Sequence, residues 1–231
     1  MNKLISIFPL SIFKDSIALP EEYKQQLIRA IFEMEAETAE AAHAGDEAWL
    51  GDTRGFAFLF QKPLFEELYR RIAETIRAYI EALGLNNELL DFYFQRSWAT
   101  ITRKGEKIHE HCHAQSNLSC SYYLRKPPHS GGIQFTTQNH PNEFATGMFS
   151  SAKADLGLIQ QQGVHNCNAV VVEPAEGDIF VFPSKSLHGT VPSESGDARI
   201  SISADITTML RDSYGHETMM PHFSNWRRFD E

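Results

Sequence analysis

The stretch that most constrains the fold reads Gly105-Glu106-Lys107-Ile108-His109-Glu110-His111-Cys112-His113. A glycine turn opens it, and two histidines two positions apart close it. Alternate residues of a β-strand face the same side, so the spacing predicts that His111 and His113 project into one cavity, with Cys112 on the opposite face. We therefore predict a strand over residues 107–113.

A third histidine lies far away in the sequence. His188 comes 75 residues after His113, just beyond the apolar run 178–182, and Arg199 opens a further alternating run eleven residues later. In a chain with ten histidines one such pair would be a weak signal. Imidazole, however, is a common ligand for iron, zinc, copper and nickel. Two ligands on one strand and a third on a distant strand predict a mononuclear metal site in a β-barrel, with positions free for substrate.

Composition excludes some classes of function. The 231 residues are 42% hydrophobic and 22% charged, typical of a globular protein, and can bury a substantial core. A formal net charge of −9 argues against general binding to nucleic acid or anionic membrane. The chain has three cysteines, an odd number without a CxxC pair (Cys112, Cys120 and Cys167), which predicts a reducing, cytoplasmic setting.

The first 90 residues predict one strand and two helices. Residues 1–10 hold a short apolar run broken by Pro9, typical of a first strand rather than a signal peptide. Apolar residues at helical spacing predict one helix from Pro20 to Ala44 and a second from Pro63, capped by Gly84. No stretch approaches the roughly 20 apolar residues that span a bilayer.

From residue 92 the hydrophobic period changes to two, and turn residues separate strand-length segments. The pattern predicts a mainly β fold, an antiparallel barrel or sandwich packed against two α-helices. Residues 136–166 lack either period and exceed usual loop lengths; we favour a lid over a disordered insertion. The predicted strands are 92–103, 107–113, 117–125, 131–136, 168–174, 178–183, 187–191 and 199–207.

We expect one catalytic domain over residues 1–231. It comprises the N-terminal strand and supporting helices (1–90), a β core carrying the insertion (91–210) and a C-terminal extension (211–231). The run 216–231, with Met219, Met220, Phe223 and Trp226, would cover a sheet face or contact a partner subunit.

Over about residues 90–210 the chain resembles the 2-oxoglutarate and iron(II)-dependent oxygenases. More narrowly, it is similar to a family in which the HxH motif is followed by a Ser-x-x-Tyr-Tyr strand. The matching segments are 105–113, Ser119-Cys120-Ser121-Tyr122-Tyr123-Leu124, Gly131-Gly132-Ile133-Gln134-Phe135, Gly177-Asp178-Ile179-Phe180-Val181-Phe182-Pro183, His188 and Arg199-Ile200-Ser201-Ile202-Ser203.

The resemblance implies a double-stranded β-helix, a jelly-roll or cupin-like barrel, with Fe(II) at its open end. It implies His111, His113 and His188 as the metal ligands, and O2 and 2-oxoglutarate as co-substrates. Arg199 and Ser201 would bind the distal carboxylate of 2-oxoglutarate, which a bidentate guanidinium suits. Tyr123 shares their strand phase and could donate its hydroxyl there, although packing in the core is an equal alternative.

The chain departs from the family at one ligand. His113 stands where most of these enzymes carry Asp or Glu, so three neutral ligands would leave more positive charge on the metal. Asp205 falls on the same strand face as Arg199. It would either contact one of the metal ligands or be a fourth ligand itself. His109 is in phase with His111 and His113 and is a spare candidate at the barrel rim.

A cupin enzyme that does not use 2-oxoglutarate is an alternative. Gly105 with the HxH pair resembles a first cupin motif, and Gly177, Pro183 and His188 resemble a second. The expected glutamate is missing from residues 114–121, and Lys185 stands where a glycine is usual. A metal-stabilised binding module that recognises a partner through residues 136–166 is the non-enzymatic alternative.

The sequence thus predicts a 2-oxoglutarate- and Fe(II)-dependent dioxygenase that hydroxylates a substrate and releases succinate and CO2. The substrate, a small molecule or a peptide, has no signature in the sequence. A homodimer is a further expectation, and neither nucleic acid nor a membrane is expected as a partner.

Overall fold

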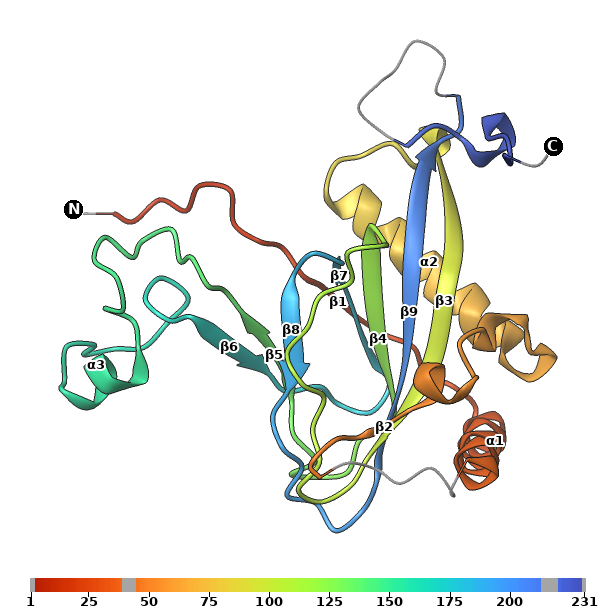
Figure 1. Ribbon diagram of the computed structural model, residues 1–231, viewed down its shortest axis with the longest axis horizontal. Coiled ribbons are helices and arrows are strands. Elements are labelled where there is room, and N and C mark those ends of the chain that lie inside the picture. The colour runs from red at the N-terminus through yellow and green to blue at the C-terminus, as the bar shows by residue number, and fades with distance from the viewer. Residues whose placement is uncertain (1–2, 39–44, 213–219, 230–231) are drawn as a thin grey trace.

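The computed structural model of the protein describes residues 3–38, 45–212 and 220–229. Within these residues, two antiparallel sheets face each other, and two long helices cover the outer face of the larger sheet (Figure 1). The larger sheet has the order β1-β7-β4-β9-β3-β2 and the smaller one β6-β5-β8. The predicted mainly β fold, a double-stranded β-helix packed against two α-helices, is confirmed.

The strands divide between the two sheets as follows. Those of the larger sheet are β1 (Phe13–Ser16), β2 (Trp49–Leu50), β3 (Leu90–Thr102), β4 (Leu118–Arg125), β7 (Asp178–Pro183) and β9 (Arg199–Leu210). Those of the smaller sheet are β5 (Ile133–Thr136), β6 (Ala169–Val172) and β8 (Leu187–Thr190).

Strand β7 shows why two layers form. Its residues Ile179 and Val181 belong to the core beneath the helices, whereas Phe180 and Phe182 pack between the sheets with residues of β5. Because successive side chains point to opposite faces, one apolar strand contributes to both cores. Strand β9 alternates differently: its isoleucines face the helices, and its polar residues face the space between the sheets.

The helices are α1 (Glu21–Glu37), α2 (Glu66–Ala82) and the short α3 (Ser151–Asp155). Single-turn 3-10 helices cover Gly51–Arg54, Leu59–Gln61, Pro63–Phe65, Asn87–Leu89 and Phe223–Asn225. Helix α2 is amphipathic, with Leu68, Ile72 and Ile76 buried against the sheet. Gly84 follows it with φ of 76°, as expected for a residue that ends a helix.

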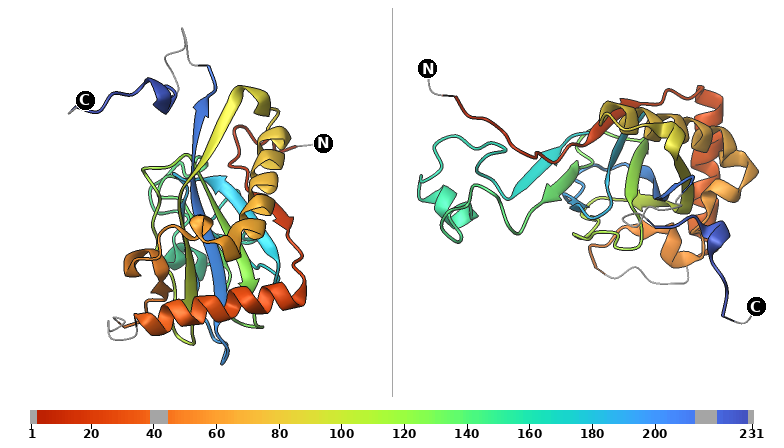
Figure 2. Two further views of the ribbon diagram at one scale, coloured as in Figure 1. Left: turned by 90° about the vertical axis from the view of Figure 1, so that its right-hand side faces the viewer. Right: turned by 90° about the horizontal axis from the view of Figure 1, so that it is seen from above.

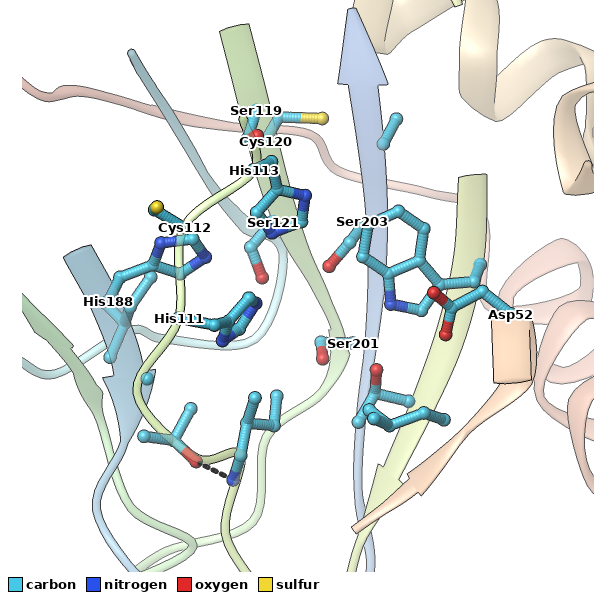
Figure 3. Close-up of a pocket in the computed structure, with 18 of the residues that line it drawn as sticks. Asp52, His111, Cys112, His113, Ser119, Cys120, Ser121, His188, Ser201 and Ser203 are labelled. Atoms are coloured by element: carbon cyan, nitrogen blue, oxygen red, sulfur yellow. Dashed lines mark hydrogen bonds between the residues drawn. The ribbon is translucent and has the colours of Figure 1, made fainter. Parts of the chain in front are cut away.

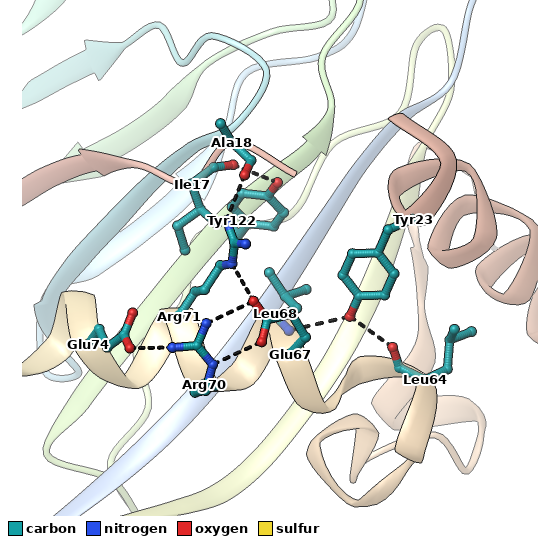
Figure 4. A network of polar contacts seen from close by, with 10 residues as sticks. All are labelled: Ile17, Ala18, Tyr23, Leu64, Glu67, Leu68, Arg70, Arg71, Glu74 and Tyr122. Atoms are coloured by element: carbon teal, nitrogen blue, oxygen red, sulfur yellow. Dashed lines mark hydrogen bonds and ion pairs between the residues drawn. The ribbon is translucent and has the colours of Figure 1, made fainter. Parts of the chain in front are cut away.

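Hydrogen bonds link the two helices and β4 to the segments that connect them (Figure 4). Arg71 of α2 donates to the carbonyl of Ala18 at 2.7 Å, and Tyr122 of β4 donates to that of Ile17 at 3.1 Å. Tyr23 of α1 donates to the carbonyl of Leu64 at 2.8 Å. The segment that joins β1 to α1 is therefore held from both sides.

Three predicted elements differ from the structure. Residues 107–113 form no strand; their pairing in that part of the chain is limited to isolated bridges. Residues 3–10 are also outside any strand, since the edge of β7 is occupied by β1. Helix α1 ends at Glu37, where the Thr38 hydroxyl bonds to the Met34 and Glu35 carbonyls; residues 39–44 of the predicted extension lie outside the described residues.

The connection from β5 to β6 contains α3, a helix that the sequence pattern does not predict. This segment projects away from the two sheets (Figures 1 and 2). At the other end of the molecule His222 is 2.7 Å from the Tyr93 hydroxyl, so part of the C-terminal extension contacts β3; residues 216–219 and 230–231 lie outside the described residues. No helix of the described residues has the length and apolar character to cross a membrane.

Candidate metal centre

His111 and His188 lie directly opposite each other in an isolated antiparallel bridge. The amide of each donates to the carbonyl of the other at 2.9 Å. Opposed residues of an antiparallel pair present their side chains on the same face. The two rings accordingly lie side by side, with centroids 4.5 Å apart.

His113 completes the group from the segment that precedes β4. Its amide donates to the carbonyl of Ser184, which fixes the backbone beside the turn between β7 and β8. Its ring stacks on Trp98 of β3, with centroids 5.6 Å apart and planes inclined by 16°. The structure thus brings together the three histidines that the sequence pattern predicts (Figure 3). They are not held by the predicted strand. The bridge to His188 holds His111, and contacts with Ser184 and Trp98 hold His113.

Each of the three rings is anchored through Nδ1. The nearest partners are the carbonyl of His109 for His111 (2.7 Å) and the carbonyl of Ser186 for His188 (2.8 Å). Asp205 Oδ1 is 2.7 Å from Nδ1 of His113. A carbonyl or carboxylate oxygen only accepts, so Nδ1 carries the proton and the Nε2 lone pair is left for the cavity. One ring nitrogen from each histidine lies within 4.8 Å of the other two.

Burial favours the neutral form of His188 and of His111, the form that binds a metal. It lowers the pKa of His188 to about 4, outweighing the opposite effect of the hydrogen bond to Ser186. Burial likewise lowers the pKa of His111. Nε2 of His113 is buried and has no hydrogen-bond partner, an expensive arrangement for a polar atom unless a ligand meets it.

Asp205 is fully buried behind His113. Burial alone would raise the pKa of its carboxyl group, but the hydrogen bond from His113, supported by Ser119 and the charge of Arg96, holds the pKa below its usual value. Ser119 donates to Oδ1 at 3.0 Å and Gln115 to Oδ2 at 3.2 Å. The Arg96 guanidinium is 3.6 Å from Oδ2. Asp205 is therefore a buried anion in contact with the histidine cluster.

A cavity of about 310 Å³ opens beside the three rings. Its wall on the larger sheet carries hydroxyl groups at one level of three neighbouring strands, from Thr100, Ser201 and Tyr123. Burial raises the pKa of Tyr123, so its hydroxyl stays a neutral donor. Thr100 is 1% exposed and its hydroxyl has no hydrogen-bond partner. Figure 3 shows Ser201 and Ser203 of β9 across the cavity from the histidines.

Arg199 lies on the same face of β9 as Ser201, one level further along the sheet and opposite Thr102, but the cavity lining does not include it. It is 1% exposed. Nη1 donates to the carbonyls of Ser130 and Gly131 at 2.8 and 3.0 Å. Nη2 donates to the hydroxyls of Thr102 and Thr190, both at 3.1 Å, while Nε has no partner. The predicted inward direction of Arg199 agrees with the structure, but its contact with the cavity runs through Thr190, which lines it.

The other candidates lie at the edges of the site. His109 lines the cavity mouth, and its side chain is 55% exposed and paired with Asp46. Cys112 is exposed and borders the cavity, and Figure 3 shows its sulfur pointing away from Ser201 and Ser203. None of the described lining residues comes from 137–168, so closure of that segment over the cavity stays a prediction.

Sequence reasoning missed Trp98, Thr100 and Thr190. The first two are in phase along β3, with Ser203 and Ser201 as their neighbours on β9, but a β-branched or aromatic residue in a strand is ordinary, so nothing marked them. Only the knowledge that β3 lies beside β9 identifies the polar members of β3 as cavity residues.

Residues 96–205 match the sequence model of a family described as "Putative 2OG-Fe(II) oxygenase". The matched region contains all three histidines, Arg199 and Asp205. The chain resembles this oxygenase family over just under half of its length. It is therefore an oxidoreductase, and its family's metal and co-substrate are Fe(II) and 2-oxoglutarate (2OG). The match favours the oxygenase over the cupin and binding-module alternatives.

Solved structures agree on the fold of this 2OG-Fe(II) oxygenase. AviO1 from Streptomyces viridochromogenes Tue57 is 14% identical with a TM-score of 0.55, covering 86% of this chain and 90% of that one. A prolyl-4-hydroxylase from Pseudomonas putida is 16% identical with a TM-score of 0.51, covering 86% and 93%. HygX from Streptomyces hygroscopicus, solved with nickel and 2-oxoglutarate bound, is 11% identical with a TM-score of 0.52, covering 86% and 83%. No curated protein matches the sequence.

The site fits the family's metal. Imidazole suits Fe(II), all three rings are anchored through Nδ1, and one buried nitrogen is otherwise unsatisfied. The hydroxyl row fits a carboxylate, whose oxygens accept hydrogen bonds, and the buried Arg199 guanidinium places a positive charge close by, in contact with the lining residue Thr190.

Proposed function

We propose that this oxygenase is a 2-oxoglutarate-dependent dioxygenase that hydroxylates its substrate and releases succinate and CO2. The observation that carries the proposal is the convergence of three anchored imidazoles on one side of a cavity whose opposite wall is lined with hydroxyls. Bound Fe(II), with 2OG and O2, would supply the oxidising chemistry.

His111, His113 and His188 are the proposed metal ligands. Three protein ligands leave positions for a chelating co-substrate and for O2. Their anchoring to two carbonyls and one carboxylate keeps each Nε2 aimed at the cavity, so the site needs little rearrangement to bind the metal.

The distal carboxylate of 2OG is proposed to lie against Ser201, Tyr123 and Thr100, with Arg199 one level further along the sheet. The three side chains donate hydrogen bonds, and Arg199 supplies the positive charge. Its four present acceptors are neutral oxygens, so the charge is not neutralised by an anion among its hydrogen-bond partners. An unpartnered Thr100 hydroxyl and Arg199 Nε support this location.

The substrate is proposed to be a small molecule or a peptide side chain. The cavity volume lies near the lower end of the range for small-molecule sites, about 300–1,000 Å³. Trp98 beside the rings offers an apolar surface, and Glu47, Asp52 and Glu110 contribute carboxylates to the lining. The single catalytic domain, the homodimer and the cytoplasmic location stay proposals beside this one.

Anaerobic titration of the Fe(II)-loaded protein with 2OG tests the co-substrate. Chelation of iron by 2OG should give a weak visible charge-transfer band, and O2 with substrate should then give succinate. Arg199→Ala should weaken 2OG binding without abolishing Fe(II) binding. A wild-type protein that binds Fe(II) but neither gives the band nor makes succinate would contradict the proposal and favour a cupin-type enzyme.

Metal stoichiometry tests the ligands. His188→Ala should lower Fe(II) content well below one ion per chain. His109→Ala is the matched control, because that ring is nearby but exposed at the cavity mouth. Equal iron content in both variants would remove His188 from the ligand set.

A further inference from the structure

The three histidines differ in what holds them. His111 and His188 each bond to the carbonyl of the residue two positions earlier, a neutral and local partner. His113 alone of the three bonds to a charged group, the carboxylate of Asp205, which comes from the other side of the barrel on β9. This difference falls on the position where most members of the family are expected to carry the acidic ligand.

Asp205 is built to keep its charge although it is fully buried. An isolated carboxylate would lose its proton only at great cost in such a place. Ser119 and Gln115 donate to its two oxygens, and Arg96 lies 3.6 Å away. Arg96 also pairs with Asp52 at 3.0 Å, so it is shared between two carboxylates and does not neutralise Asp205 fully.

The ring of His113 is fixed in two directions. Stacking on Trp98 restrains the ring plane, and the bond to Asp205 determines which nitrogen faces the cavity. Nε2, the atom opposite that bond, is buried and unpartnered. A carboxylate that accepts from one nitrogen of an imidazole raises the electron density on the other and so its basicity toward a metal.

We propose that Asp205 is a positioning residue that replaces, through the ring of His113, the carboxylate ligand absent from position 113. It orients His113 and places one negative charge a single imidazole away from the metal. Three imidazoles alone would leave a divalent ion with its full charge, whereas the Asp205–His113 pair offsets one unit of it. The inference rests on the proposed function only in taking the three histidines as ligands.

Binding of Co(II) to the metal-free protein tests the inference without catalysis. Asp205→Asn keeps the shape and an acceptor oxygen but removes the charge. We expect Co(II) affinity to fall by roughly 10- to 100-fold, the usual effect of removing a partner behind a metal ligand, and the visible ligand-field bands of Co(II) to shift. Asp178→Asn is the matched control, because Asp178 is also buried and ion-paired, with Lys14 at 2.7 Å, but lies outside the cavity lining.

A double-mutant cycle separates positioning from general damage. If Asp205 acts through the ring of His113, Asp205→Asn should have no further effect on Co(II) affinity in a His113→Ala background. Thermal unfolding of each metal-free variant reports any loss of fold. A 10- to 100-fold effect that persists without His113 would overturn the proposal, as would wild-type affinity and wild-type bands in Asp205→Asn.

The same titrations distinguish failure of this inference from failure of the proposed function. If His188→Ala binds Co(II) as tightly as wild type, the histidine cluster is not the metal site and both fall. If His188→Ala loses Co(II) while Asp205→Asn and Asp178→Asn match wild type, only the inference about Asp205 is wrong.

Discussion

His111 and His188 hold each other in register, because the amide of each donates to the carbonyl of the other at 2.9 Å. This bridge joins a segment without strand structure to the start of β8. The rings of the two proposed ligands are therefore placed by a backbone contact, and not by a continuous strand.

Gly189 lets the two segments approach. A Cβ there would lie 2.8 Å from the Ile108 carbonyl oxygen and 3.2 Å from the Glu110 amide nitrogen. We expect Gly189→Ala to push residues 108–110 away, displace His111 and weaken Co(II) binding, with a stability cost of about 1–3 kcal/mol. Titration with Co(II) and urea unfolding measure both effects.

Gly196→Ala is the control for that substitution. No atom lies within 4 Å of a Cβ at Gly196, and the residue is outside the cavity lining. It should keep wild-type metal affinity. Wild-type affinity in Gly189→Ala as well would mean that the bridge does not position His111.

The alternation of the sequence predicts the strands that bury a face, such as β4, β7 and β9, whereas β1 is mostly exposed and is not predicted. It failed at residues 107–113, where histidines two positions apart are equally compatible with an irregular segment held by a bridge. Only tertiary contacts from Ser184, Trp98 and Asp205 place His113 there.

Strand pairing is the other feature that sequence could not supply. Asp205 was recognised as sharing a face with Arg199, yet its contact with His113 depends on β4 lying beside β9 and on the turn after β7. Thr100 gains its role only because β3 pairs with β9 at Ser201. The periodicity of the sequence predicts which side chains share a face of a strand. The order of the strands in the sheet determines which of those side chains become neighbours.

Metal binding should stabilise the fold. The histidines come from two chain segments that unfolding separates, so Co(II) at 100 times its dissociation constant should add about 2.7 kcal/mol to the free energy of unfolding. Addition of a chelator should reverse the gain in wild type. His113→Ala should show little gain at the same Co(II) concentration, and an equal gain would place the stabilising ion elsewhere.

Acid should destabilise the metal-free protein through His188. The pKa of its imidazole is about 4 in the folded protein and 6.5 in the unfolded chain, so unfolding takes up a proton between these values. The contribution is present above pH 6.5 and is lost as the pH falls toward 4. Between pH 7 and pH 5 it amounts to about 2 kcal/mol. Urea unfolding at both values should show this loss in wild type and a smaller one in His188→Gln.

We expect the Thr100 hydroxyl to strengthen 2OG binding and to lower the free energy of unfolding. It is 1% exposed, has no hydrogen-bond partner and lines the cavity beside Ser201, so the folded protein bears the cost of an unsatisfied polar group, about 1–3 kcal/mol.

Thr100→Val has the same shape without the hydroxyl. It should keep or raise the free energy of unfolding, yet weaken 2OG binding roughly 10- to 100-fold, because a hydrogen bond to a charged group is worth about 1.5–3 kcal/mol. Thr207→Val, buried on β9 outside the cavity lining, should leave 2OG affinity unchanged. If Thr100→Val binds 2OG like wild type while Arg199→Ala does not, the carboxylate is held by Arg199 without help from β3.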